Sequence, residues 1–181
     1  MGKAIGVMEF RSIGKGIESL DAMLKCASVS VILSRIICIG KYFVIITGDV
    51  AAVENAINTG NIIGTNEVKG SLIIPSVAEG VLEKINVKID KSDIKALGIV
   101  ETKSLAYGIL AANSVKKSSN VELLKVSIML GLGGKCLVLF TGDVASVESA
   151  LEYTKNKIND NPKIVSAISI PSPSKELIDA L

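Results

Sequence analysis

The segment AIGVME at residues 4–9 recurs as ALGIVE at residues 96–101, and this recurrence decides how the rest of the chain is interpreted. A second segment, TGDVA, occurs unchanged at residues 47–51 and 141–145. Similar residues follow one another in the same order in both halves, with small differences in spacing. Self-similarity of this kind indicates a duplicated structural unit whose length differences lie in loops.

The duplication suggests where the 181 residues divide. An Ile-Pro pair closes the repeated pattern at residues 74–75 and again at 170–171, and a polar stretch around Lys91 precedes the second copy. A chain of this length can form two small domains, each with its own core. We therefore predict a first domain over residues 1–91 and a second over residues 92–181.

Each copy is expected to contain four strands. In the first copy they are the apolar or β-branched runs at residues 4–10, 29–37, 42–47 and 71–74. Gly40 lies in the short gap between the two middle runs, which is typical of a β-hairpin.

Two helices are expected between these strands. Ser12 can cap the first, and its apolar face is predicted from three residues at helical spacing, Ile17, Leu20 and Leu24. Asp49 follows the hairpin and is expected to cap a second helix that extends through Ala56.

The predicted order is β-α-β-β-α-β, repeated twice, which places the chain in the α/β (α+β) class as two tandem ferredoxin-like domains. This order gives an antiparallel sheet with both helices on one face, and leaves the other face and the sheet edges available for contacts. A two-domain chain can fill two of six positions in a ring. Three chains would then close by cyclic symmetry into a pseudohexameric trimer.

Composition excludes several classes of partner. The 20 basic and 18 acidic residues are interspersed, so no basic stripe is present to bind nucleic acid or an anionic membrane surface. The most apolar stretch, residues 126–140, is too short for a membrane span and is interrupted by glycines and Lys135. No signal-peptide pattern precedes the first strand, and the three cysteines lack short spacings, so we expect a cytoplasmic protein.

The sequence also argues against an enzyme. It contains no histidine, and no serine or cysteine lies in a recognisable nucleophile motif. Asp49 and Asp143 are interpreted as helix caps rather than catalytic carboxylates. The glycine-rich run that ends at Lys135 is not a phosphate-binding loop, because Cys136 stands where that motif needs serine or threonine.

The repeated segments resemble the bacterial microcompartment shell domain over nearly the whole of both copies. The resemblance rests on residues 4–9, the helix segment DAMLK at 21–25, the pair Gly40-Lys41, and TGDV at 47–50 with its counterpart in the second copy. It implies a flat pseudohexameric trimer that tiles edge to edge with other shell proteins in a polyhedral shell around an enzyme cargo.

The resemblance also assigns roles to particular residues. It implies that Lys25 and Lys117, at the ends of the first helix of each copy, lie at the tile edge; a lysine there also interacts favourably with the helix dipole. It places the hairpin tips around a central pore, whose predicted lining is Cys38, Ile39, Gly40, Gly131, Leu132, Gly133 and Gly134.

Among shell proteins with two tandem domains, the resemblance is to the propanediol-utilisation type, in which a pore cysteine holds an iron–sulfur cluster. The corresponding residue here is Cys38. Three symmetry-related thiolates would leave one iron of a 4Fe-4S cluster open to another ligand, so the cluster would be shared by three chains. An encapsulated or cytosolic redox enzyme would then be a further partner. Cys26 and Cys136 are predicted to be buried packing residues.

Two alternatives remain open from the sequence. The shell tile could have a metal-free, thiol-lined pore for metabolites. The chain could instead be a ferredoxin-like regulatory protein that binds a small ligand, which would show saturable binding without lateral assembly.

Overall fold

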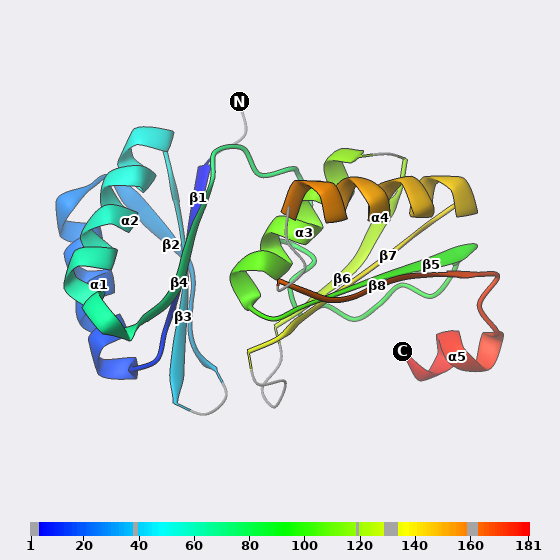
Figure 1. The fold of residues 1–181 in the computed structure, drawn as a ribbon, viewed down its shortest axis with the longest axis horizontal. Helices are drawn as coiled ribbons and strands as arrows, with labels where there is room; N and C mark the ends of the chain where they lie inside the picture. Colours follow the sequence, from blue (N-terminus) through cyan, green and yellow to red (C-terminus); the bar gives the residue numbers. More distant parts are fainter. Residues whose placement is uncertain (1–3, 38–39, 119, 129–133, 159–162) are drawn as a thin grey trace. The chain divides into compact units, whose positions relative to one another are not determined.

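The structure is a computed structural model, and it describes residues 4–37, 40–118, 120–128, 134–158 and 163–181. Its residue contacts divide the chain into two compact units, Met1–Val77 and Ala78–Leu181, which Figure 1 draws coloured along the sequence. The predicted division after residue 91 falls in the segment between the two repeated folds. This segment, residues 78–95, belongs to the second unit.

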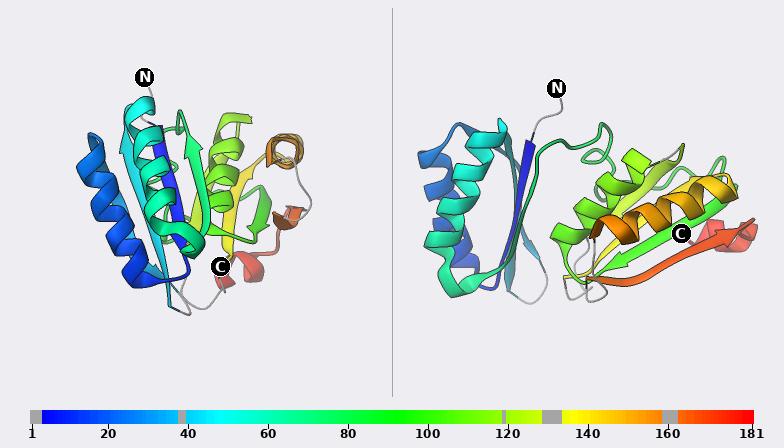
Figure 2. Two further views of the ribbon diagram at one scale, coloured as in Figure 1. Left: turned by 60° about the vertical axis from the view of Figure 1, so that its left-hand side comes forward. Right: turned by 45° about the horizontal axis from the view of Figure 1, so that its top comes forward.

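The first unit is a four-stranded antiparallel sheet with two helices on one face, as both views of Figure 2 show. Its strands are hydrogen-bonded in the order β2-β3-β1-β4. In chain order the elements are β1 (Ala4–Phe10), α1 (Ile13–Cys26), β2 (Val29–Ile37), β3 (Lys41–Gly48), α2 (Val50–Gly64), a 3-10 turn (Thr65–Glu67) and β4 (Val68–Ile74).

The second unit repeats this arrangement with the strand order β6-β7-β5-β8. Its elements are β5 (Ala96–Thr102), α3 (Leu105–Ser118), β6 (Glu122–Ser127), β7 (Cys136–Gly142), α4 (Val144–Ile158), β8 (Ile164–Pro171) and α5 (Lys175–Ala180). The predicted β-α-β-β-α-β order is therefore confirmed in both copies. In the described part of the chain, no helix is long and apolar enough to cross a membrane.

The predicted apolar face of α1 was wrong in part. Leu20 is buried, but Ile17 and Leu24 are 52% and 40% exposed, and the buried stripe instead runs through Gly16, Ser19, Leu20 and Met23. The reason is close packing, because a Cβ at Gly16 would lie 2.5 Å from Cδ1 of Tyr42. Gly16 therefore faces the sheet at this point, and the helix is rotated so that Ile17 and Leu24 lie toward solvent.

Helix α2 is longer than predicted, ending at Gly64 rather than near Ala56. Its buried residues Val53, Ala56, Ile57 and Gly60 continue the helical period beyond the predicted end. The helix stops where Thr65 takes a positive φ of 47°.

The three predicted caps, Ser12, Asp49 and Asp143, each directly precede a helix, but they differ in whether the side chain makes a capping hydrogen bond. The Ser12 hydroxyl accepts a hydrogen bond from the Lys15 N–H at 3.3 Å. Asp49 precedes α2, but its side chain makes no capping hydrogen bond. Asp143 accepts a 2.7 Å hydrogen bond from the Ser146 N–H, and this bond lowers the pKa of Asp143. The second copy therefore has the stronger cap at the equivalent helix.

Candidate functional site

The β2–β3 hairpin is the element that would carry the predicted pore residues of the first unit. Its two strands pair as far as Ile37 and Lys41, so residues 38–40 connect them. Gly40 has a φ of 69°, a conformation that favours glycine. The predicted pore residues Cys38 and Ile39 lie outside the described residues, directly after Ile37 in sequence.

The β6–β7 hairpin is the equivalent element of the second unit. Its last strand pair is Ser127 with Leu137, and Gly134 before β7 has a φ of 87°. Thus each hairpin returns through a glycine of positive φ directly before a lysine, at Gly40 and Gly134. The predicted pore residues Gly131, Leu132 and Gly133 lie outside the described residues.

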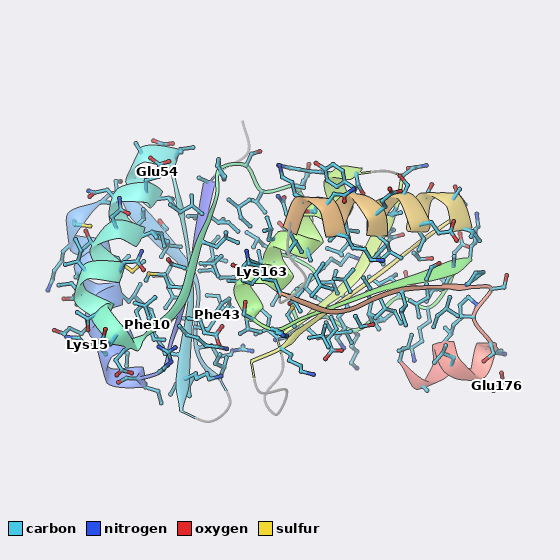
Figure 3. All side chains as sticks on the ribbon, in the orientation of Figure 1. Phe10, Lys15, Phe43, Glu54, Lys163 and Glu176 are labelled. Atoms are coloured by element: carbon cyan, nitrogen blue, oxygen red, sulfur yellow. The ribbon has the colours of Figure 1, made fainter. Side chains whose placement is uncertain are left out.

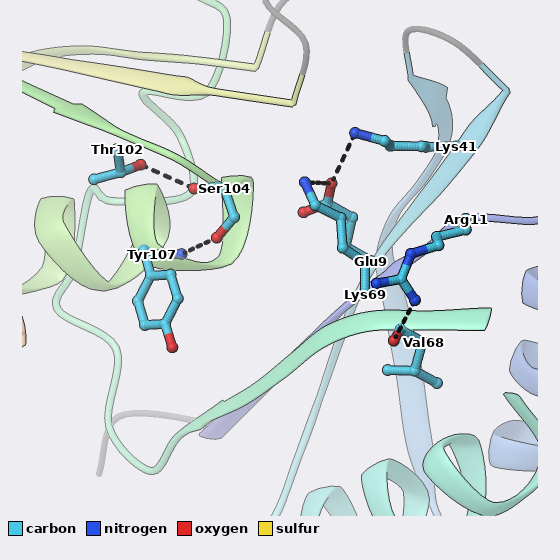
Figure 4. Close-up of polar contacts among 8 residues, drawn as sticks. All are labelled: Glu9, Arg11, Lys41, Val68, Lys69, Thr102, Ser104 and Tyr107. Atoms are coloured by element: carbon cyan, nitrogen blue, oxygen red, sulfur yellow. Dashed lines mark hydrogen bonds and ion pairs between the residues drawn. The ribbon is translucent and has the colours of Figure 1, made fainter. Parts of the chain in front are cut away.

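A cluster of opposite charges lies at the turn end of the first hairpin. The Glu9 side chain on β1 is 1% exposed, and its Oε1 lies 2.7 Å from Nζ of Lys69 on β4 and 3.9 Å from Nζ of Lys41 on β3. Figure 4 shows both lysines reaching the same carboxylate. A buried carboxylate needs such partners because burial removes its hydration. The cluster thus ties three strands together next to the hairpin turn.

The second hairpin has a reduced version of this cluster. Lys135 lies 2.8 Å from the carboxylate of Glu101, but the two side chains are 46% and 30% exposed. Val165 occupies the position equivalent to Lys69, since Ser166 pairs with Glu101 as Gly70 pairs with Glu9. Our sequence predictions gave these charges no role. A glutamate recurring in two otherwise apolar strands was the signal that could have revealed them.

The two described cysteines differ from each other. Cys136 is buried as predicted, and burial raises the pKa of its thiol to about 12, so it stays protonated near neutral pH. Cys26 was predicted to be buried, and this was wrong. It lies exposed in the last turn of α1, where its Sγ contacts the Met23 carbonyl at 3.3 Å. Helix α1 turns Met23 rather than Cys26 toward the sheet.

The described ranges lack a cluster of side chains that could bind a metal ion. Within them, no group of three or more Cys, His, Asp or Glu side chains is close enough to hold a metal ion. Of the two described cysteines, Cys26 lies at the end of a helix and Cys136 lies in the core.

The predicted edge lysines both lie near the C-terminal end of an equivalent helix. Lys25 on α1 is 74% exposed at its side chain and forms an i,i+4 ion pair with Asp21 at 2.5 Å. Lys117 on α3 is also exposed. Each is accessible to a neighbouring molecule, and their role in tiling stays a prediction.

The second unit also contains a surface hollow of about 570 Å³. Its charged lining residues are three lysines and three acids, Lys84, Lys95, Lys116, Asp93, Glu122 and Asp143. Because both signs are equally represented, the hollow presents no strong field of one sign to a small charged ligand.

Comparison with known proteins identifies the repeated fold. Residues 4–77 and 96–173 each match the family described as the BMC domain. The chain belongs to the BMC domain family. The two matched segments contain both four-stranded sheets and leave residues 78–95 between them. The shell-domain resemblance inferred from the sequence is therefore confirmed.

Two microcompartment proteins are similar to this chain over almost its full length. The bacterial microcompartment shell protein PduT of Citrobacter freundii is 38% identical over 177 residues, covering 98% of this chain and 96% of the relative. The crystal structure of a microcompartments protein from Desulfitobacterium hafniense DCB has 41% identity and a TM-score of 0.86, covering 98% of each chain.

A shorter relative matches less than half of the chain. The bacterial microcompartment shell protein PduA of Salmonella typhimurium is 37% identical over 75 residues, which cover 40% of this chain and 80% of the relative. The similarity to PduT thus spans both BMC domains of this chain, whereas the similarity to PduA spans less than half of it.

Proposed function

We propose that the chain is a structural tile of a bacterial microcompartment shell and assembles as a homotrimer with six BMC domains in a ring. The observation that carries this proposal is the presence of two BMC domains of the same strand order in one chain. Cyclic closure of three such chains gives each domain the same kind of neighbour on either side. The role needs shape and exposed edges rather than a catalytic group.

Shell proteins of related kinds would be the lateral partners of this trimer. Similarity to PduT along the whole chain supports this assignment. The exposed lysines at the ends of α1 and α3 are the residues we assign to contacts between tiles.

We assign the redox site to Cys38. With one Cys38 per chain, a threefold axis would bring three thiolates together, which suits a 4Fe-4S cluster with one iron open to another ligand. The β2–β3 pairing supports this assignment, because it brings the chain to its turn directly after Ile37. When bound, such a cluster would supply one-electron chemistry, or iron and sulfide for transfer, to an encapsulated or cytosolic redox enzyme.

Anaerobic purification followed by native mass spectrometry and visible spectroscopy tests both parts of this function. We expect a particle of three 18.9 kDa chains, with a broad visible absorption and about one cluster per trimer. Cys38→Ser should remove the colour and leave the trimer, whereas Cys26→Ser should leave both. A stable monomer would contradict the tile assembly.

The two alternatives give different outcomes. A colourless trimer, even after reconstitution with iron and sulfide, would leave a tile with a metal-free, thiol-lined pore. Saturable binding of a small molecule to a monomer would favour a regulatory protein instead.

A further inference from the structure

The two sheets differ at one edge. Strands β2 and β6 are equivalent edge strands, but the outer side of β6 is hydrogen-bonded to the segment that precedes β5. The Val126 N–H donates to the Lys84 carbonyl, and the Asn86 N–H donates to the Val126 carbonyl, both at 2.9 Å. Among the described residues β2 pairs with β3 alone. Residues 84–86 therefore form a short parallel bridge along the outer side of β6, and no described residue forms one along β2.

This segment is fixed by further contacts within the second unit. The Asn86 side chain donates to the Ile128 carbonyl at 2.9 Å and accepts from the Ile128 N–H at 2.7 Å. Eight residues earlier, the Ala78 N–H donates to the side-chain oxygen of Asn113 on α3 at 2.8 Å. Val81, between these anchors, is fully buried. We call residues 78–85 the first tail, because they follow the last strand of the first copy.

The edge strands differ in exposure at equivalent positions. The β-bulge between Val31 and Leu33 matches the one between Leu123 and Lys125, which fixes the correspondence of β2 with β6. Three apolar positions are 2–3% exposed in the second unit, at Leu123, Leu124 and Ile128. Their counterparts Val31, Ile32 and Ile36 are 40%, 38% and 54% exposed. An exposed apolar edge strand is a template for pairing with another segment.

The chain carries a second segment of the same pattern. The first tail, AEGVLEKI, follows the Ile-Pro pair at 74–75, and SKELIDAL at residues 174–181 follows the pair at 170–171 with the same spacing. Both have apolar residues at the fourth, fifth and eighth positions. We call residues 174–181 the second tail.

The second tail has few contacts with its own unit. Helix α5 has no buried residue, and Leu177, the counterpart of the fully buried Val81, is 36% exposed. Figure 3 shows Glu176 on the outside of this helix. Its contacts with the second unit include a hydrogen bond from Lys91 Nζ to the Asp179 carbonyl and partial packing of Leu181 on the second sheet.

We propose that the second tail of one chain docks along β2 of the next chain in the ring, as the first tail docks along β6. This inference rests on the proposed trimer. The same contact would then recur at each domain of the ring: the segment that follows the last strand of one domain would cover the edge strand of the next domain. Asp21, the counterpart of Asn113, would accept the hydrogen bond that Asn113 accepts from the first tail. Cyclic closure would then leave no β2 edge uncovered.

Cross-linking between two differently tagged chains tests this contact. Ile85 and Val126 form the backbone bridge of the first tail, and their counterparts are Leu181 and Ser34. One chain carries Ser34→Cys and the other Leu181→Cys, both with Cys26→Ser and Cys38→Ser, and they are co-expressed and mildly oxidised. We expect a disulfide-linked pair of the two different chains, because bridged strand residues lie within disulfide reach.

The matched control replaces Leu181→Cys by Glu54→Cys, an exposed position on α2, and should give no specific pair. Trimers that are intact by native mass spectrometry but show no Ser34→Cys to Leu181→Cys cross-link would overturn the docking and leave the proposed function standing. Absence of any trimer in the parent protein would overturn both.

A second variant measures what the tail contributes. Leu177→Asp should raise the trimer dissociation constant at least about tenfold, because it would put a carboxylate where the first tail buries Val81. Leu177→Val, which copies the first tail, should change it little. An unchanged dissociation constant in Leu177→Asp would contradict the proposal.

Discussion

The two copies place large and small residues at opposite positions of their cores. Where the first unit has a glycine the second has a larger side chain, and where the first has a bulky side chain the second has a smaller one. In the first unit, Cβ atoms added to Gly60 and Gly64 of α2 would overlap Met8, Met23 and Phe10, so bulky residues use the space that the glycines leave. In the second unit the three bulky residues are replaced by the smaller Val100, Val115 and Thr102. The two glycines are replaced by the larger Thr154 and Ile158. Volume is thus exchanged between one helix, α2 or α4, and the strand and helix packed against it, and one fold accepts either distribution if the total is kept.

Removing the largest of these side chains should have the largest effect. Phe10 is fully buried, and its ring lies 6.5 Å from that of Tyr42. We expect Phe10→Ala to lower the free energy of unfolding by about 3 to 5 kcal/mol through loss of burial and the cavity left behind. Denaturant unfolding with hydrogen exchange should locate the loss in the first unit. Thr102→Ala, at the equivalent position, should cost about 1 kcal/mol, and equal losses would contradict the comparison.

Transferring one residue between the copies tests the exchange of volume directly. Gly60→Thr gives the first unit the residue of the second, with a Cβ 2.6 Å from the Met8 sulfur and 2.7 Å from the Met23 sulfur. It should cost about 1 to 3 kcal/mol. Adding Met8→Val and Met23→Val should recover part of that loss, measured as a coupling of about 1 kcal/mol in a mutant cycle. Strict additivity would show that these positions are independent.

The charge cluster differs between the copies in burial, so equivalent substitutions should differ in effect. Lys69→Met removes the 2.7 Å partner of the buried Glu9 and leaves Lys41 at 3.9 Å. We expect a loss of about 1.5 kcal/mol, reduced from that of a fully buried pair because Lys69 is partly exposed. Lys135→Met breaks a more exposed pair and should cost under about 1 kcal/mol. Thermal unfolding measures the loss of stability in both variants. A larger loss in Lys135→Met than in Lys69→Met would contradict the comparison.

A buried hydroxyl in the second unit offers a stabilising change. The Thr154 Oγ1 is buried without a hydrogen-bond partner in the described structure, at the position where the first unit has Gly60. Thr154→Val removes the unsatisfied group and nearly keeps the shape, so stability should rise by about 1 kcal/mol. Thr154→Ser, which keeps the hydroxyl and loses the methyl group, should be destabilising. A loss of stability in Thr154→Val would indicate that the hydroxyl is satisfied in solution.

The helix caps should give the smallest contrast. Asp143 accepts the Ser146 N–H, whereas Asp49 makes no capping bond, so Asp143→Ala should lower the melting temperature more than Asp49→Ala. The pKa of Asp143 is lowered in the folded state, so its contribution is present above the unfolded pKa and is lost as the pH falls through the folded value. The difference between the variants should therefore shrink in acid. A constant difference would mean that the carboxylate is not the cap.

The duplication, the order of strands and helices and the position of the hairpins could all be predicted from the residues alone. These features depend on local signals: β-branched runs, Ser12 and Asp143 before helices, and glycines such as Gly40 between strands. Local signals survive without knowledge of the partner elements, because they act through backbone conformation and hydrogen bonds between near neighbours.

The faces and edges that each element uses depend instead on tertiary packing. Ile17 and Leu24 looked like core, yet Gly16 faces the sheet because Tyr42 fills the space above it. Cys26 looked like a packing residue and is exposed, and Glu9 in an apolar strand is buried between lysines from two other strands. Each outcome depends on atoms that are distant in sequence, and no periodicity within one segment records where those atoms will be.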